Sequence, residues 1–150
     1  MSVVTTVSPG PPSTDVTPAG GQPPADMLNP AVTQATITTT ICVSGYTKTI
    51  RPPQSYTGPL KVHQITTYGY ADTSTGSYEE DHAIALEVGG APSAPANLWP
   101  EPHAASGPDD TLENTLKAQV CSGALTLADA QSQLFAAKVA HGYHREKSVA

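Results

Sequence analysis

The stretch YEEDHAIALEVGG, residues 78–90, joins an acidic segment with one histidine to an apolar run. Within residues 84–88 every second residue is Ile, Leu or Val, a spacing that is typical of a half-buried β-strand. The glycine pair at 89–90 is expected to end this strand. Asp81 and His82 are therefore expected at the entrance of the strand or within its first half.

Asp81 and His82 form a pair that suits one-metal phosphodiester hydrolysis. Such a reaction needs a neutral imidazole that takes a proton from water. It also needs a hard cation, held by carboxylate or amide oxygens, to neutralise charge on the phosphate. Neighbouring residues on a regular strand point to opposite faces, so a bend or bulge is required to bring both side chains to one site. An exposed charge pair in a polar turn is the simpler alternative.

Residues 91–102, APSAPANLWPEP, predict a proline-rich loop with one short extended piece at 97–99. Fourteen residues separate His82 from Asn97. Asparagine is a common turn residue, and a turn at Asn97 would hold this loop in place. Trp99 is expected to fill the core, with stacking on a nucleobase as the alternative.

Two helices are predicted after this loop. The first is expected to be capped at its start by Asp109 or Asp110, and Glu113 is placed to complete a capping box. Its apolar residues recur at intervals of four and define one face: Leu112, Leu116 and Val120. The second is predicted to begin at Thr126, with Asp129 three residues later. Its inward residues are expected to be Leu127, Ala130, Leu134 and Ala137.

The chain before residue 78 carries weaker patterns. TITTTICV, residues 36–43, is rich in β-branched residues and predicts a strand. Arg-Pro-Pro at 51–53 and Tyr-Thr-Gly-Pro at 56–59 are turn signals. A short helix is predicted over 59–70, where apolar residues recur at mixed spacing.

Residues 1–30 contain seven of the fifteen prolines and no aromatic residue. Such a segment cannot bury enough apolar surface to offset the entropy lost on ordering, so a disordered tail is expected. The folded domain is expected over residues 31–140, and a frayed basic tail over 141–150. A chain of 150 residues accommodates one such domain.

The net charge of −6 argues against a protein that coats nucleic acid non-specifically, because such binding depends on neutralising phosphates. A local active site is still compatible with this charge. The cations expected to reach a nucleic-acid backbone are Lys48, Arg51, Lys61 and Lys117. No run of eighteen apolar residues occurs, which excludes a membrane-spanning helix, and the N-terminus lacks the pattern of a signal peptide.

Cys42 and Cys121 are too few for a disulfide scaffold, and their spacing is not that of a zinc site. One bridge would close a long loop and stabilise a small core. Two buried, reduced thiols are the alternative. Cys42 lies in an apolar segment, where an unreactive thiol is expected rather than a nucleophile.

The runs EDHAIALEVGG (80–90) and NLWPEP (97–102), followed by DDTLENTL (109–116), resemble the HNH or His-Me finger nucleases. CVSGYTKTIRPP (42–53) and VCSGALTLADAQ (120–131) resemble further parts of one bacterial HNH-like family. The core of that family is two strands and a helix around one metal ion. The resemblance implies an α+β domain with a small ββα-metal core, an extra N-terminal strand segment and C-terminal helices.

In the family pattern the residue at the place of His82 is the general base, and its acidic neighbour, here Asp81, is a metal ligand. The residue at the place of Asn97 orients the base or the loop that carries it. A third His or Asn follows in the family, where Ser106 stands in this chain. The further ligand candidates are Asn114 and Glu113 of the following helix, and His103. Asn114 is favoured over Glu113, because asparagine lowers helix propensity in mid-helix and glutamate has a capping role.

The resemblance implies a metal-dependent nuclease that cleaves DNA or RNA phosphodiester bonds. Mg²⁺ is the favoured ion, with Mn²⁺, Ni²⁺ or Zn²⁺ as alternatives. DNA is favoured over RNA as the substrate, a protein inhibitor is a further expected partner, and the chain is expected to be a monomer.

The resemblance also favours a bridge between Cys42 and Cys121, and with it a secreted or cell-surface location. Because the sequence shows no signal peptide, the cytoplasm is the alternative. A second hypothesis is a catalytically inactive HNH-like scaffold that acts as a secreted or surface binding module. Ser106 at a ligand position and the negative net charge favour this second hypothesis.

Overall fold

The computed structural model describes residues 21–145, which form an α+β fold. Two strands, β1 (Tyr78–His82) and β2 (Leu98–Pro102), pair antiparallel along their whole length. Helix α3 (His103–Ser122) begins at the residue after β2. The order strand, strand, helix expected for the core is therefore present.

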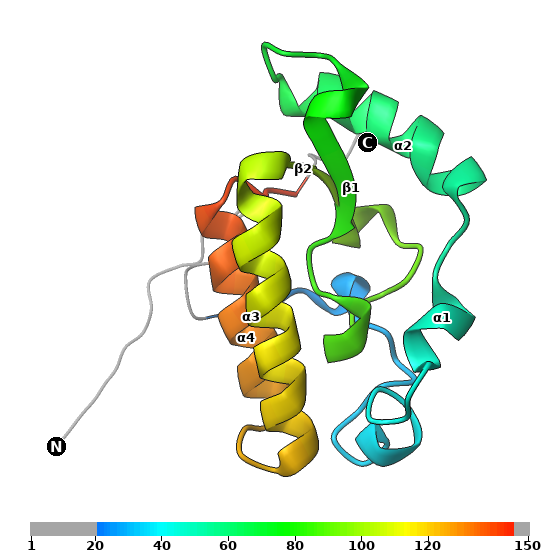
Figure 1. Cartoon of the computed structure of the whole chain (residues 1–150), viewed down its shortest axis with the longest axis vertical. Helices are drawn as coiled ribbons and strands as arrows, with labels where there is room; N and C mark the ends of the chain where they lie inside the picture. Colours follow the sequence, from blue (N-terminus) through cyan, green and yellow to red (C-terminus); the bar gives the residue numbers. More distant parts are fainter. Residues whose placement is uncertain (1–20, 146–150) are drawn as a thin grey trace, which may run out of the picture.

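Helices cover both sides of this small sheet. The other α-helices of the described chain are α1 (Tyr46–Ile50), α2 (Gln54–Tyr68) and α4 (Leu127–Ala140). The connections contain short 3₁₀ helices: η1 (Ala25–Met27), η2 (Ile37–Thr39), η3 (Thr75–Ser77), η4 (Leu86–Val88) and η5 (Pro95–Asn97). Figure 1 shows α3 and α4 side by side on one side of the sheet and α2 on the other.

The strand predicted over residues 84–88 is wrong, because β1 ends at His82 and the chain then forms a loop with η4. Beyond β1 the side chain of Asn97, not a neighbouring strand, binds the backbone N–H and carbonyl of Ile84. The apolar residues of this segment are buried in the core. The alternating pattern therefore marks burial of a loop, and Asp81 and His82 lie at the end of a strand rather than at its start.

Both helices that contain a proline begin earlier than the sequence predicts. Pro59 is the sixth residue of α2, which begins at Gln54, and Pro108 is the sixth residue of α3, which begins at His103. A proline removes one helical hydrogen bond and is normally read as a helix boundary. Each of the two helices contacts both strands of the sheet, and we attribute its continuation through the proline to this packing. Residues 109–110 are consequently within α3 and do not cap it.

The predicted start of α4 is confirmed. The Thr126 hydroxyl accepts a hydrogen bond from the Asp129 N–H at 3.1 Å, which satisfies one of the free donors at the helix start.

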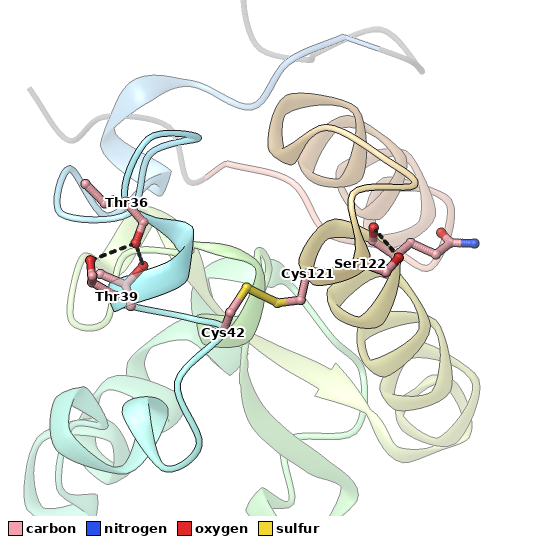
Figure 2. Close-up of a disulfide and its surroundings, with 7 residues drawn as sticks. Thr36, Thr39, Cys42, Cys121 and Ser122 are labelled. Atoms are coloured by element: carbon pink, nitrogen blue, oxygen red, sulfur yellow. Dashed lines mark hydrogen bonds between the residues drawn. A yellow bond between two sulfur atoms is a disulfide. The ribbon is translucent and has the colours of Figure 1, made fainter.

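The strand predicted over residues 36–43 is also wrong, since the segment folds into η2 and turns. Its threonines bond to the local backbone. The Thr39 hydroxyl donates to the Thr36 carbonyl at 3.1 Å (Figure 2). The Thr40 hydroxyl donates to the same carbonyl at 2.8 Å. Such side-chain bonds compete with strand pairing.

The predicted disulfide between Cys42 and Cys121 is present and spans 79 residues of sequence. Figure 2 shows it joining the threonine-rich segment to the last turn of α3. Because both cysteines are bonded, neither is a thiol nucleophile.

The folded region extends further at both ends than residues 31–140. Met27 and Tyr143 are buried in one apolar cluster with Trp99, which is itself fully buried. The Asp26 carboxylate forms a bidentate ion pair with the Arg145 guanidinium, with both N–O distances at 2.8 Å. Residues 21–30 and 141–145 thus pack against each other and the core, which contradicts a tail at these positions. The rest of the two predicted tails, 1–20 and 146–150, lies outside the described residues.

Trp99 fills the core as expected, so the nucleobase-stacking alternative is wrong. Among residues 21–145, none of the helices has the length and apolar character needed to cross a membrane.

Candidate active site

His82, the last residue of β1, is anchored by one ring nitrogen. Its Nε2 lies 2.8 Å from the Pro92 carbonyl oxygen. A carbonyl only accepts, so Nε2 carries the hydrogen and Nδ1 keeps the lone pair in the neutral ring. Burial lowers the pKa of His82, although the Pro92 carbonyl and the Asp81 charge oppose this shift. The imidazole is therefore in the basic, neutral form at neutral pH.

Asn97 fixes the backbone around that hydrogen bond. Its Oδ1 accepts from the Ile84 N–H at 2.7 Å, and its Nδ2 donates to the carbonyls of Ile84 and Ala91 at 3.0 and 2.9 Å. Ile84 follows His82 by two residues, and Ala91 directly precedes Pro92. The asparagine is completely buried and does not itself line the cleft, so it is a positioning residue.

Two of the predicted metal ligands, Asp81 and Glu113, lie close to each other. Both of their carboxylates pair with the same ammonium group. The Nζ of Lys138, from α4, lies 3.0 Å from Asp81 Oδ2 and 2.9 Å from Glu113 Oε2. It also donates to the His82 carbonyl oxygen at 2.8 Å. The lysine side chain is 0% exposed.

This cluster joins one ammonium and two carboxyl groups from three elements, α4, β1 and α3. Burial lowers the pKa of Lys138, but the carboxylates of Asp81 and Glu113 outweigh burial and raise it above the usual value. The lysine is therefore charged. Burial also raises the pKa of Glu113, and the Lys138 ammonium opposes that shift.

A second pair of buried acids lies behind this cluster. Burial, a hydrogen bond with Asp109 and the charge of Asp81 raise the pKa of Glu101 to about 10. Glu101 is therefore protonated at neutral pH. Asp109 in turn accepts from His141 Nδ1 at 2.8 Å.

Lys138, Glu101 and Asp109 were not predicted as site residues. Lys138 follows Leu134 by four residues and so lies on the predicted inward face of its helix. A buried lysine needs a carboxylate partner, so that spacing was a usable signal. For Glu101 the sequence offers no comparable signal. Asp109 was expected as a helix cap, a role that the earlier start of α3 removes.

Except for Asn97, the predicted site residues line two clefts, and both clefts include Arg51, Asp81 and His82. The smaller, of about 290 Å³, is also lined by Glu113, Asn114 and Arg51. The larger, of about 680 Å³, includes Arg51 and His103. Ser106, at the family's third-ligand position, lines neither cleft.

Asn114 is engaged at the edge of the smaller cleft. With the amide turned so that its nitrogen faces Glu87, that nitrogen donates to the Glu87 carboxylate at 2.7 Å. His103 Nε2 lies 3.0 Å from the Gly76 carbonyl, at the far end of the sheet from His82. Asn114 therefore shares the smaller cleft with Asp81 but is bonded to Glu87, whereas His103 lies away from Asp81.

These donors do not fit a divalent ion as they are arranged. In the part of the chain from 21 to 145, no group of three or more His, Cys, Asp or Glu side chains is placed to hold a metal. The oxygens of Asp81 and Glu113 that converge do so on the Lys138 ammonium. A metal between them would have to displace that ammonium.

No family model, curated protein sequence or solved structure matches this chain. The site therefore has to be interpreted from its own geometry.

The charge around His82 is mixed. Arg51 is exposed and lines both clefts. Lys61, by contrast, is already bonded, because its ammonium donates to the Tyr78 carbonyl at 3.0 Å. Glu79 and Glu80 line the larger cleft and contribute negative charge. Of these side chains, Arg51 is the cation best placed to meet an anion beside His82.

Proposed function

We propose that this chain hydrolyses phosphodiester bonds of nucleic acid, with His82 as the general base. The observation that carries the proposal is the anchoring of His82 through Nε2 to the Pro92 carbonyl, which leaves Nδ1 as the basic nitrogen in a cleft-lining residue. A neutral imidazole with one nitrogen fixed is the arrangement that a general base needs.

In the proposed reaction, Nδ1 of His82 takes a proton from water. The water oxygen forms a bond to phosphorus, the bond to the departing sugar oxygen breaks, and that oxygen takes a proton from solvent. Arg51 would pair with the non-bridging phosphate oxygens, because its guanidinium is permanently charged and matches phosphate geometry. His82 then loses its proton to solvent.

No step is assigned to the divalent ion that the sequence resemblance implies, because Lys138 lies between its expected ligands Asp81 and Glu113. DNA is the substrate proposed first and RNA second. Since acidic side chains line the larger cleft, affinity for either is expected to be modest and to fall steeply with salt.

The test compares nicking of plasmid DNA and cleavage of a single-stranded RNA by the full chain, with EDTA, Mg²⁺ or Mn²⁺. His82→Ala should abolish cleavage, and so should His82→Gln, which can still donate to the Pro92 carbonyl. His63→Ala is the matched control, because His63 is exposed on α2 and lines neither cleft. Equal cleavage by the wild type and the His82 variants, or none by the wild type in any condition, counts against the proposal.

A second candidate function is a binding module without hydrolytic activity. The buried Lys138 favours this candidate, because an ammonium at the expected metal position is what a site that has lost its metal would show. The Cys42–Cys121 bridge supports a secreted or cell-surface location for either function, since disulfides persist in oxidising compartments. Salt-dependent binding of a labelled DNA oligonucleotide that is recovered intact would favour this candidate over the nuclease.

A further inference from the structure

The Lys138 ammonium is the most completely enclosed charge of the candidate site. Its Nζ donates hydrogen bonds to Asp81 Oδ2 at 3.0 Å and to the His82 carbonyl at 2.8 Å, and it forms an ion pair with Glu113 Oε2 at 2.9 Å. An ammonium has three donors and no acceptor, so its three neighbours are all oxygens. Because the lysine side chain is 0% exposed, the group is not available to a substrate.

We infer that the Lys138 ammonium replaces a divalent cation between Asp81 and Glu113, so that the native chain takes up no divalent ion there. The inference concerns the cation of the proposed nuclease site and rests on the proposed function for its catalytic meaning. Its binding test does not depend on hydrolysis.

The chemistry of the donors supports this replacement. Two carboxylates and one backbone carbonyl, all hard oxygen donors, are the ligands that Mg²⁺, Mn²⁺ and Ca²⁺ prefer. They come from β1 and α3, the two elements between which the ββα pattern predicts a metal. The position is thus suited to a cation and already contains one.

The fold fixes the lysine in this position. Lys138 belongs to α4, and Leu134 and Phe135 of the same helix are buried in the core, which sets the rotation of the helix. With its side chain completely covered, Lys138 cannot leave the carboxylates without moving α4. A divalent ion entering beside it would face a like charge at close range, which a buried site strongly disfavours.

Lys138 is therefore a positioning residue rather than a catalytic one. By bonding to the carbonyl of His82 and to Asp81 it links the end of β1 to α4, and through Glu113 to α3. In the proposed nuclease it would hold the strand end that carries the base, a task that a metal ion would otherwise perform.

The test measures Mn²⁺ binding by electron paramagnetic resonance on the full chain. The wild type should bind no Mn²⁺ that depends on Asp81 or Glu113. Lys138→Ala should gain one Mn²⁺ per chain, with affinity at least ~10-fold above the wild type and a Mn²⁺-dependent rise in melting temperature. Lys138→Ala combined with Asp81→Asn should lose that ion. Lys48→Ala, which removes an exposed lysine of α1, is the control for the change in net charge.

A Mn²⁺ ion bound by the wild type and lost in Glu113→Gln overturns the inference, and so does a folded Lys138→Ala that gains no ion. If Lys138→Ala does not fold, the comparison of wild type with Glu113→Gln decides alone. Cleavage of nucleic acid is scored separately. Absence of cleavage counts against the proposed nuclease and leaves the Mn²⁺ result valid. If the wild type cleaves nucleic acid and also binds Mn²⁺ through Glu113, the inference about Lys138 is wrong and the proposed nuclease stands.

Discussion

Asn97 binds both backbone polar groups of Ile84, accepting from its N–H at 2.7 Å and donating to its carbonyl at 3.0 Å. Its second amide hydrogen goes to the Ala91 carbonyl at 2.9 Å. One buried side chain therefore fixes the chain on both sides of the hydrogen bond between His82 and Pro92. The position of the imidazole therefore depends on Asn97, whose side-chain hydrogen bonds go to backbone groups of Ile84 and Ala91.

Asn97→Ala should destabilise the protein by roughly 3 kcal/mol, because it leaves several buried backbone groups without partners. Urea unfolding followed by far-ultraviolet circular dichroism measures the change. Asn114→Ala is the matched control, since Asn114 is exposed on α3, and it should cost less than about 1 kcal/mol. An Asn97→Ala protein as stable as the wild type would contradict the role given to this side chain.

Gly90→Ala should prevent normal folding, because an added Cβ would lie 1.7 Å from the Ile84 carbonyl oxygen and 2.8 Å from Asn97 Nδ2. The first contact is with backbone, which cannot move without breaking the bonds of Asn97. Gly58→Ala is the control: its Cβ meets no atom within 4 Å, and in a helix it should gain about 0.5–1 kcal/mol. Thermal melts followed by circular dichroism should show no cooperative transition for Gly90→Ala and a melting temperature at or above that of the wild type for Gly58→Ala.

The disulfide should contribute about 4 kcal/mol, because it closes a loop of 79 residues in the unfolded chain. Cys42→Ser and Cys121→Ser should each lose this amount, and the double variant should lose little more. Guanidinium unfolding with and without reductant checks the size of the effect. Alkylation without reductant should add no mass, and two modified thiols would rule the bridge out.

Features that depend on neighbouring residues could be predicted from the sequence. The cap at Thr126 needs only its own hydroxyl and the backbone three residues later, and it is present. The antiparallel pair followed by a helix is present as well, but it was expected from the family resemblance, and the local strand pattern at 84–88 does not belong to it. By contrast, the start of α3 depends on contacts that carry the helix past Pro108, and no local pattern reports such contacts.

In the candidate site, too, the features set by neighbouring residues could be predicted and those set by distant contacts could not. Asp81 and His82 are adjacent in sequence, and both line the clefts. The partner of Asp81 is 57 residues away, on another helix, and is a cation supplied by the chain itself. The family resemblance implied a metal ion at that position, and the spacing of Lys138 in its helix was the sequence sign that a lysine could occupy it instead.

If His82 is the general base, the acid limb of the pH–rate profile should lie below pH 6.5. Burial lowers the pKa of His82 from its usual value, so the neutral form persists to lower pH than in an exposed histidine. Initial rates of cleavage from pH 4.5 to 8 measure this limb. His103→Ala should leave it unchanged, and a limb at or above pH 6.5 would refute the assignment.

Glu101 should make the protein less stable as the pH rises. Its pKa is about 10 in the folded protein, chiefly because of burial, against an ordinary value of 4.5 when unfolded. Between these values the folded state binds a proton that the unfolded state has lost, so the free energy of unfolding falls as pH increases from about 4.5 to about 10.

Glu101→Gln keeps a neutral side chain of the same size at every pH. Urea unfolding at pH 5, 7 and 9 should therefore show a shallower decline in the variant than in the wild type. Some decline should persist, because the pKa of Glu113 is also raised. Parallel curves for the two proteins would mean that Glu101 is ionised in the fold.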